Sequence, residues 1–317
     1  MLQSAKMKKR GQINIVINSE EREKNDSIWG REGNYPPIDH VEYRNVMKSF
    51  DDYVGLESIK SFVHEIYSWI YINNIRQDKG LKTGQQALHM IFKGNPGTGK
   101  TTVARLIATM LRDLNVLEKG HFIEVERADL VGEYIGHTAQ KTRNLVEKAL
   151  GGVLFIDEAY SLARGGEKDF GKEAIDALVK VMEDQQHNFV LILAGYPVEM
   201  DRFMRLNPGL PSRFPMVLTF PNYSVEELLK MTKSMAAQRD YELDDESMTY
   251  MNELLIIAKE YEHGRFSNGR FIRNLLEKAI RIQAVRLLQE KEYSRDILAT
   301  LRRIDFERAF HNILGES

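Results

Sequence analysis

The feature that most constrains the fold of this chain is the segment Gly94–Thr101, with the sequence Gly-Asn-Pro-Gly-Thr-Gly-Lys-Thr. It follows an apolar run at Met90–Phe92 and precedes a helical pattern that begins near Val103. Glycines let such a loop curl until successive N–H groups point inward, which creates a binding site for phosphates at the start of a helix. A strand, this loop and a helix in that order predict a P-loop NTPase, whereas the alternative is an ordinary glycine-rich turn.

The motif also assigns a role to its lysine and to its threonine. Lys100 is expected to reach the β- and γ-phosphates of the nucleotide, and the hydroxyl of Thr101 is expected to ligate Mg²⁺. The residues expected to bind the nucleotide here are Gly94, Asn95, Pro96, Gly97, Thr98, Gly99, Lys100, Thr101 and Thr102.

Bulk composition narrows the setting and the class of partner. The 317 residues are enough for about two domains, and 44 Lys and Arg against 46 Asp and Glu leave a net charge of −2. This balance gives no overall attraction to nucleic acid or to an anionic membrane. There is no cysteine, and no apolar run approaches the length of about 20 residues that spans a bilayer. We expect a cytoplasmic protein that does not enter membranes and for which nucleic acid is not the favoured partner.

The middle of the chain alternates between strand-like and helical patterns. After Met90–Phe92, apolar runs recur at His121–Val125, Val153–Ile156, Phe189–Leu193 and Met216–Phe220. Helical spacing of apolar residues occurs at Glu57–Arg76, 138–150 and 171–184. This alternation predicts an α/β fold with a parallel sheet flanked by helices.

The pattern changes after Pro221. Four segments, 224–238, 245–262, 269–292 and 305–314, read as helices, and no further strand is expected. Ser224 and Glu227 have the spacing of a capping box at the start of the first helix. The predicted organisation is an N-terminal arm at 1–48, an α/β nucleotide-binding domain at 49–221 and a small all-α domain at 222–317.

The arm contains a mixed-charge run and the pair Pro36-Pro37, which favours a solvated, flexible segment. The alternative is a docking element, in which Ile13–Ile17 pairs as a strand with another surface.

A second chemical motif lies at the end of a predicted strand. Val153–Ile156 is followed by Asp157 and Glu158, and parallel sheets bind ligands at the carboxyl ends of their strands. Asp157 is expected to hold Mg²⁺ indirectly or through water, and Glu158 to orient and deprotonate the attacking water. This pair favours hydrolysis over the alternative of an acidic surface loop. The chain lacks an Asn-Lys-x-Asp motif for guanine, so ATP is the expected nucleotide.

Several motifs together resemble the AAA+ ATPases. They are Asp52–Leu56, Gly94–Thr101, Val153–Glu158 and the Asn-Gly-Arg-Phe-Ile-Arg-Asn stretch at 268–274. The stretches Asp129–Thr138 and Leu193–Tyr196 are similar to the branch that contains the red-type Rubisco activases and the sporulation ATPases of spore-forming bacteria. The resemblance covers the chain from about residue 50 to its C-terminus, and it implies that the helical domain is an AAA+ lid.

The resemblance implies further nucleotide contacts. Val54 and Gly55 would line the adenine pocket. Arg213 matches an arginine finger that reaches the γ-phosphate of a neighbouring subunit, which implies a ring, typically a hexamer. Arg205 is the competing candidate, and a surface ion pair is the structural alternative for Arg213.

At the start of the last long predicted helix, Arg270 matches the sensor 2 arginine that projects from the lid toward the nucleotide. Arg273 lies one turn later on the same face and competes for that role, and plain surface charge is the alternative for both. Many family members carry Asn, Ser or Thr at the end of the fourth strand. Here Tyr196 stands there, and the resemblance assigns it no role.

Tyr134, Ile135 and Gly136 match the pore loop with which AAA+ remodelling proteins grip a polypeptide. An aromatic side chain can hold a chain without reading its sequence, and glycine lets the loop flex. Glycines on both sides favour exposure of Tyr134, and packing over a core edge is the alternative.

The function expected from the residues and the resemblance together is an ATP-hydrolysing ring that remodels or threads a protein partner, in sporulation. The protein substrate is not specified by the sequence. Two alternatives stay open: a nucleic-acid motor or clamp-loader-like ATPase, and a scaffold switched by nucleotide binding.

Overall fold

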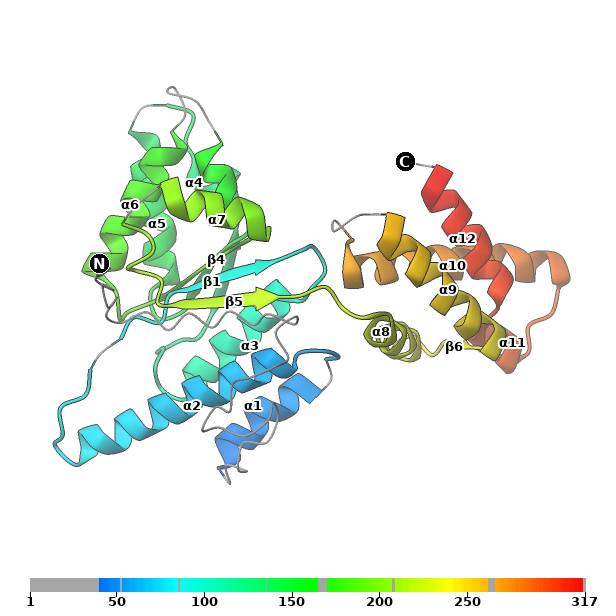
Figure 1. Cartoon of the computed structure of the whole chain (residues 1–317), viewed down its shortest axis with the longest axis horizontal. Helices are drawn as coiled ribbons and strands as arrows, with labels where there is room; N and C mark the ends of the chain where they lie inside the picture. The colour runs from blue at the N-terminus through cyan, green and yellow to red at the C-terminus, as the bar shows by residue number, and fades with distance from the viewer. Residues whose placement is uncertain are drawn as a thin grey trace, which may run out of the picture. The chain divides into compact units, whose positions relative to one another are not determined.

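A computed structural model describes residues 40–51, 53–84, 86–134, 136–164, 170–206, 209–261 and 266–315. The strand considered at Ile13–Ile17 lies outside these residues. The chain divides into two compact units (Figure 1). The first contains the described residues up to Phe50, then Leu56–Gly94 and Lys100–Phe220. The second contains Asp51–Gly55, Asn95–Gly99 and the chain from Pro221 onward, so most of the phosphate loop belongs to it.

The first unit is built on a sheet of five strands, all parallel, in the order β2-β3-β4-β1-β5. The strands are β1 (Met90–Gly94), β2 (Phe122–Val125), β3 (Val153–Ile156), β4 (Val190–Gly195) and β5 (Met216–Phe220). Every predicted strand run is therefore confirmed. The central strand β1 pairs Met90 with Ile192 of β4 on one side and with Met216 of β5 on the other.

Helices cover both faces of this sheet, because side chains that alternate along a strand enter opposite cores. In β1, Met90 and Phe92 enter one core and Ile91 enters the other. The first core is closed by α1 (Val41–Asp51), α2 (Glu57–Asp78) and α3 (Lys100–Asp113). The second is closed by α4 (Arg127–Leu130), α5 (His137–Ala149), the 3₁₀ turn η1 (Ala159–Ala163), α6 (Gly171–Asp184) and α7 (Pro197–Leu206).

The helix α1 differs from the sequence-based expectation, which placed residues up to 48 in a flexible arm. It buries Val46 and Phe50 in the first core. Its tyrosine Tyr43 shares a 2.7 Å hydrogen bond between its hydroxyl and Nδ1 of His64 on α2. Val46, Met47 and Phe50 have helical spacing, so the sequence held a signal for this helix, and these tertiary contacts explain why it forms.

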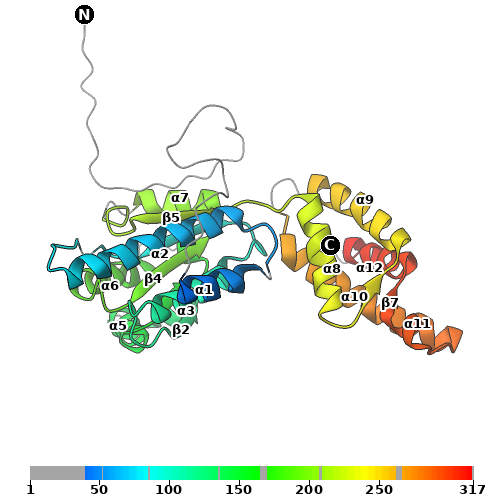
Figure 2. The same ribbon diagram turned by 90° about the horizontal axis from the view of Figure 1, so that it is seen from below.

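The second unit consists mainly of helices that pack side by side (Figure 2). They are α8 (Val225–Ala237), α9 (Asp245–Tyr261), α10 (Asn268–Glu290), α11 (Arg295–Ala299) and α12 (Arg303–Gly315). The predicted capping box is confirmed, since the Ser224 hydroxyl accepts from the amide of Glu227 and the Glu227 carboxylate accepts from the amide of Ser224.

The expectation of no strand after Pro221 is wrong in a small respect. Two-residue strands, β6 (Glu242–Leu243) and β7 (Thr300–Leu301), pair in parallel. Segments this short carry no periodic signal in the sequence. Their pairing follows from the fold, which buries Leu301 completely and brings the two segments together.

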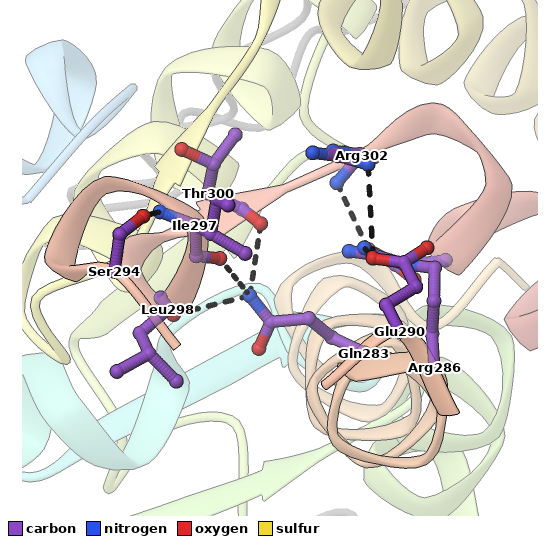
Figure 3. Close-up of polar contacts among 9 residues, drawn as sticks. Gln283, Arg286, Glu290, Ser294, Ile297, Leu298, Thr300 and Arg302 are labelled. Carbon is purple, nitrogen blue, oxygen red and sulfur yellow. Dashed lines mark hydrogen bonds and ion pairs between the residues drawn. The ribbon is translucent and has the colours of Figure 1, made fainter. Parts of the chain in front are cut away.

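Polar contacts fix the connection between α10 and α12 (Figure 3). Gln283 donates through Nε2 to the carbonyls of Leu298 at 3.1 Å and Thr300 at 2.8 Å. Arg286 forms a bidentate pair with Asp305, with both nitrogen–oxygen distances at 2.9 Å. Asp305 also accepts from the backbone N–H of Arg302 at 2.9 Å and is fully buried, so its charge depends entirely on these donors.

Among the residues that the structure describes, no helix combines the length and apolar composition needed to cross a bilayer.

Replacing Asp305 with Ala is expected to destabilise the second unit by about 3 kcal/mol, because the Arg286 charge stays buried without its partner. Hydrogen exchange followed by mass spectrometry should show faster exchange in α10 and α12. Lys230→Ala, which removes an exposed ion pair with Glu226 in the same unit, should leave exchange in these helices nearly unchanged. Equal exchange in the Asp305 variant and the wild type would show that the buried pair contributes nothing.

Candidate functional site

The phosphate loop has the backbone that its sequence predicts. Gly97 and Gly99 adopt φ values of +69° and +94°, which side-chain-bearing residues rarely take. The helix α3 begins at Lys100, and Thr101 and Thr102 lie in its first turn. Nζ of Lys100 donates to the carbonyl of Gly94 at 2.8 Å, which holds the ammonium group back over the end of β1.

Contacts on the outer side of the loop explain why Gly97 must be glycine. A Cβ atom at this position would lie 2.2 Å from the carbonyl oxygen of Ser267 and 2.6 Å from the amide nitrogen of Arg270. The amide of Gly269 donates to the carbonyl of Gly97 at 3.1 Å. The start of α10 therefore packs directly against the loop within the second unit.

Two residues that the sequence analysis did not select also contact the loop. The hydroxyl of Tyr223 donates to the carbonyl of Thr98 at 3.1 Å, and Nδ2 of Asn268 lies 3.3 Å from the carbonyl of Pro96. Asn268 opens the Asn-Gly-Arg motif, so the sequence held a signal for it. Tyr223 follows Pro221 and Asn222 in an unpatterned segment, and its contact depends on the three-dimensional fold.

Asp157 and Glu158 follow β3 directly, as the sequence predicts. All four residues of β3 are buried, whereas Asp157 is half-buried and Glu158 is exposed. Glu158 adopts a φ of +46°, and its amide donates to Oδ1 of Asp157 at 2.9 Å. A left-handed glutamate carries a conformational cost that a functional site commonly tolerates. The sheet thus presents two adjacent carboxylates at the carboxyl end of β3, which lies between β2 and β4.

Tyr160 supports this acidic pair and was not selected from the sequence. Burial raises the pKa of Tyr160 well above its ordinary value, and the nearby Glu158 carboxylate adds to the rise. The hydroxyl therefore stays protonated and can donate. The Tyr160 ring lies 6.0 Å from that of Tyr196 and directly against Gly195, where a Cβ atom would come within 2.7 Å of it. Tyr196 therefore lies next to Tyr160, which is itself close to Glu158.

The residues present fit a nucleotide with Mg²⁺ better than a protein-only metal site. Within the described residues, no group of three or more His, Asp or Glu side chains is placed to hold a metal ion. Mg²⁺ keeps several waters and needs only one or two protein ligands when phosphates supply the others. A threonine hydroxyl and one strand-end carboxylate, Thr101 and Asp157, are ligands of that kind.

Arg213 makes contacts within its own chain. Its Nη2 donates to the Oε1 of Glu183 on α6, and its Nη1 donates to the carbonyl of Gly209 at 2.6 Å. Its Nε is buried and finds no hydrogen-bond partner among the described residues. Arg205, the competing candidate, is exposed at the end of α7, where its Nε donates to the carbonyl of Asp201 at 3.3 Å.

The remaining predicted nucleotide contacts lie in the second unit. Arg270 and Arg273 are both exposed in the first two turns of α10, and the structure does not choose between them. Val54 is half-buried in a turn. Gly55 has a φ of +72°, and a Cβ atom there would lie 2.5 Å from Oε1 of Glu227 and 2.9 Å from the Tyr223 ring.

The predicted pore loop exposes its aromatic residue. Tyr134 is 65% exposed, and its ring meets that of His137 edge to face at 5.4 Å. Gly136 has a φ of +82° and open space around it. Ile135 lies outside the described residues. The base of the loop is fixed by Thr138, a buried residue whose hydroxyl accepts from the amide of Gly132 at 2.9 Å.

Comparison with protein families assigns both parts of the chain. Residues 90–222 match the model of the ATPase family associated with various cellular activities (AAA). Residues 224–315 match the model of the AAA lid domain.

Three curated relatives illustrate the similarity. Stage V sporulation protein K of Bacillus subtilis is 54% identical over 308 residues, which cover 94% of each chain. The chloroplastic ribulose bisphosphate carboxylase/oxygenase activase of Cyanidioschyzon merolae is 44% identical over 249 residues, 78% of this chain and 84% of the relative. The plasmid protein CbxX of Cupriavidus necator is 44% identical over 238 residues, 75% of this chain and 74% of the relative.

Replacing Gly97 with Ala is expected to weaken ADP binding at least tenfold, because the new Cβ atom collides with Ser267 and the backbone is strained at positive φ. Isothermal titration calorimetry with Mg-ADP measures this change. The matched control is Gly84→Ala, since no heavy atom lies within 4 Å of a Cβ atom there and the backbone is outside the left-handed region. Equal affinity in the two variants would contradict the assignment of the loop.

Proposed function

This chain belongs to the AAA family of ATPases, and from that premise we propose that it assembles into a ring and uses ATP hydrolysis to remodel or thread a protein partner. The observation that carries the remodelling step is the exposure of Tyr134 between two glycines. The exposed ring offers apolar area to a partner chain, as the proposed pore-loop role requires.

The hydrolytic step follows from the two strand-end carboxylates. We assign phosphate binding to Lys100 and the loop amides, and Mg²⁺ binding to Thr101 and Asp157. Glu158 is assigned the orientation and deprotonation of the attacking water. Phosphoryl transfer needs charge neutralisation and an aligned nucleophile more than covalent help, which suits this small set of groups. Val54 and Gly55 are assigned to the adenine, and Arg270 to sensing the nucleotide state, with Arg273 as its competitor.

Arg213 is assigned to the neighbouring subunit's nucleotide. A cation supplied in trans can raise the rate of such reactions by about 10³–10⁵. Its pairing with Glu183 means that ring assembly must offer Arg213 a stronger anionic partner than a half-exposed carboxylate. The phosphates of ATP, which carry several negative charges, are such a partner. This exchange makes hydrolysis depend on assembly.

The relatives guide the biological setting. We propose a role in sporulation on the basis of the similarity to Stage V sporulation protein K, with a hexameric ring in the cytoplasm as the working form. The target is a protein, as the name of the activase relative indicates for that relative. The pore loop grips any chain through apolar area, so it does not select the target.

Glu158→Gln is expected to bind ATP with wild-type affinity while its hydrolysis falls at least 100-fold, because the amide cannot take a proton from water. Steady-state phosphate release and ATP titration measure the two effects. The variant with ATP should also retain a protein substrate that can be recovered and identified by mass spectrometry. Glu158→Gln with Tyr134→Ala should retain none.

These outcomes separate the alternatives. Normal biological function of the Glu158 variant combined with loss in Lys100→Ala would favour a nucleotide-switched scaffold. Salt-sensitive stimulation of hydrolysis by DNA would favour a nucleic-acid motor. Undiminished hydrolysis in Glu158→Gln would remove Glu158 from the reaction.

Mixing two inactive variants tests the action of Arg213 in trans. Lys100→Ala and Arg213→Ala should each lose most hydrolysis alone, because one lacks the phosphate contact and the other lacks the finger. Mixed subunits should regain activity where an intact loop faces an intact Arg213. Arg205→Ala serves as the matched control and should retain hydrolysis by itself. No recovery on mixing, after subunit exchange is shown by native mass spectrometry, would place Arg213 in its own subunit's site or outside catalysis.

A further inference from the structure

We propose that Tyr223 and Asn268 are positioning residues for the ATPase reaction, which hold successive peptide groups of the phosphate loop in the orientation that binds phosphate. The proposal rests on the assignment of residues 94–101 as the phosphate site. It adds to that site two residues of the second unit that need not touch the nucleotide. All the contacts that carry it lie within this unit, which includes Asn95–Gly99.

The loop carbonyls are engaged one after another. Three consecutive ones accept from the second unit's helical part: Pro96 from Nδ2 of Asn268, Gly97 from the amide of Gly269 and Thr98 from the hydroxyl of Tyr223. The carbonyl before them, at Asn95, accepts from the hydroxyl of Thr98 at 2.8 Å. Every carbonyl from 95 to 98 therefore has a donor.

Peptide geometry turns these contacts into control of the amides. In a planar trans peptide group the C=O and N–H bonds point in opposite directions. A donor on each of the three carbonyls thus directs the N–H groups of Gly97, Thr98 and Gly99 away from the donors. Those are the amides that a phosphate-binding loop must present, and each flips out of position if its peptide group rotates.

Asn268 is the centre of this arrangement. Its Nδ2 lies 2.9 Å from Oδ1 of Asn222, 2.8 Å from the carbonyl of Phe266 and 3.3 Å from that of Pro96. Its Oδ1 accepts from the amide of Tyr223 at 3.0 Å. The two N–H bonds of Nδ2 are shared among these three oxygens, and the N–H of Tyr223 at the other end fixes the orientation of the amide group. Asn268 thereby ties the segment that carries Tyr223 to the start of α10.

A row of three carboxamides extends the link into the loop itself. Oδ1 of Asn222 accepts from Asn268 and also from Nδ2 of Asn95, at 2.9 Å in each case. The side chain of Asn95, at a position the loop motif leaves open, is therefore anchored to the same segment. Loop backbone and loop side chain are held by one network.

The network also carries two signs of specialisation. Asn268 is completely buried and has a φ of +47°, a left-handed backbone conformation that asparagine adopts more readily than most residues with a side chain. Burial raises the pKa of Tyr223 to about 12, with a contribution from the Glu227 carboxylate. Its hydroxyl keeps its proton near neutral pH, as tyrosines in general do, and is a donor there.

The test compares nucleotide affinity with stability in Tyr223→Phe and Asn268→Asp. Tyr223→Phe keeps the ring and removes the donor, so the Kd for Mg-ADP should rise about fivefold, which corresponds to a hydrogen bond worth about 1 kcal/mol. Asn268→Asp keeps the shape and the tolerance for positive φ but sets a carboxylate against oxygen atoms. Its Kd should rise at least tenfold, and the KM for ATP should rise in parallel.

Tyr250→Phe is the matched control, since it removes a hydroxyl from a partly buried tyrosine on α9 of the same unit. It should leave the Kd for Mg-ADP unchanged. Asn268→Gly separates the effect of the side-chain donor from that of the backbone conformation. Glycine adopts positive φ freely but lacks the amide group, so this variant should bind ADP as weakly as Asn268→Asp. Recovery of wild-type affinity in Asn268→Gly would contradict the role of the amide.

Thermal unfolding without nucleotide distinguishes a positioning role from a merely structural one. A structural role predicts a lower unfolding temperature for Tyr223→Phe and Asn268→Asp but an unchanged Kd, and that result would overturn the proposal. The same result would leave the proposed function intact, because Lys100→Ala would still abolish nucleotide binding. Loss of the Lys100 effect would instead remove the phosphate-site assignment on which this inference rests.

Discussion

The backbone carbonyls of the phosphate loop need hydrogen-bond donors, and much of this structure supplies them. A loop that turns its N–H groups toward a ligand must turn its carbonyls the other way, and buried carbonyls without donors cost free energy. Here the carbonyl of Gly94 accepts from Lys100, and those of the next four residues accept from Thr98, Asn268, Gly269 and Tyr223. The donors to Pro96, Gly97 and Thr98 lie 125 or more positions away in the sequence.

The parallel sheet determines where charged side chains can be placed. Strands that are buried on both faces must be apolar, and β3 is buried along its whole length. Polar chemistry can begin only where the strand ends, and Asp157 and Glu158 occupy that point. The left-handed backbone of Glu158 turns the chain into η1, which begins at Ala159 and brings Tyr160 beside the carboxylate. The two carboxylates follow β3 directly because every position within the strand is buried and cannot hold a charged side chain.

The strands, the long helices and the capping box of this chain could be predicted from sequence because each is a local pattern. Apolar runs at 153–156 and 216–220 specify buried strands, and Ser224 with Glu227 specifies a helix start. The first helix, α1, also has helical spacing at Val46, Met47 and Phe50, but its stability comes from burial of Val46 and Phe50 against distant residues. The pair β6–β7 depends in the same way on the folded second unit.

The residues of the candidate site also fall into two groups, those that a local motif predicts and those that are placed only by the three-dimensional fold. The loop glycines, Lys100, Asp157 and Glu158 follow from motifs whose chemistry requires those residue types in that order. Tyr223, Asn222 and Tyr160 carry no such signature, since a tyrosine or asparagine in a connecting segment has many uses. Their positions are defined by hydrogen bonds across the fold, to Thr98, to Asn95 and Asn268, and beside Glu158.

Arg213 has an intrachain partner, Glu183, which its proposed role in a neighbouring subunit's site would have to displace. A guanidinium group half-buried beside Glu183 has an adequate partner in its own chain, so it gains little by moving unless a denser negative charge is offered. The buried Nε that lacks a partner among the described residues lowers the cost of leaving, because one of its donors is already unsatisfied. In the proposed ring, the triphosphate bound by a neighbouring subunit would supply both the charge and additional acceptors. If Arg213 acts in trans as proposed, the intrachain pair would be its resting position, and assembly rather than nucleotide binding alone would draw it into the reaction.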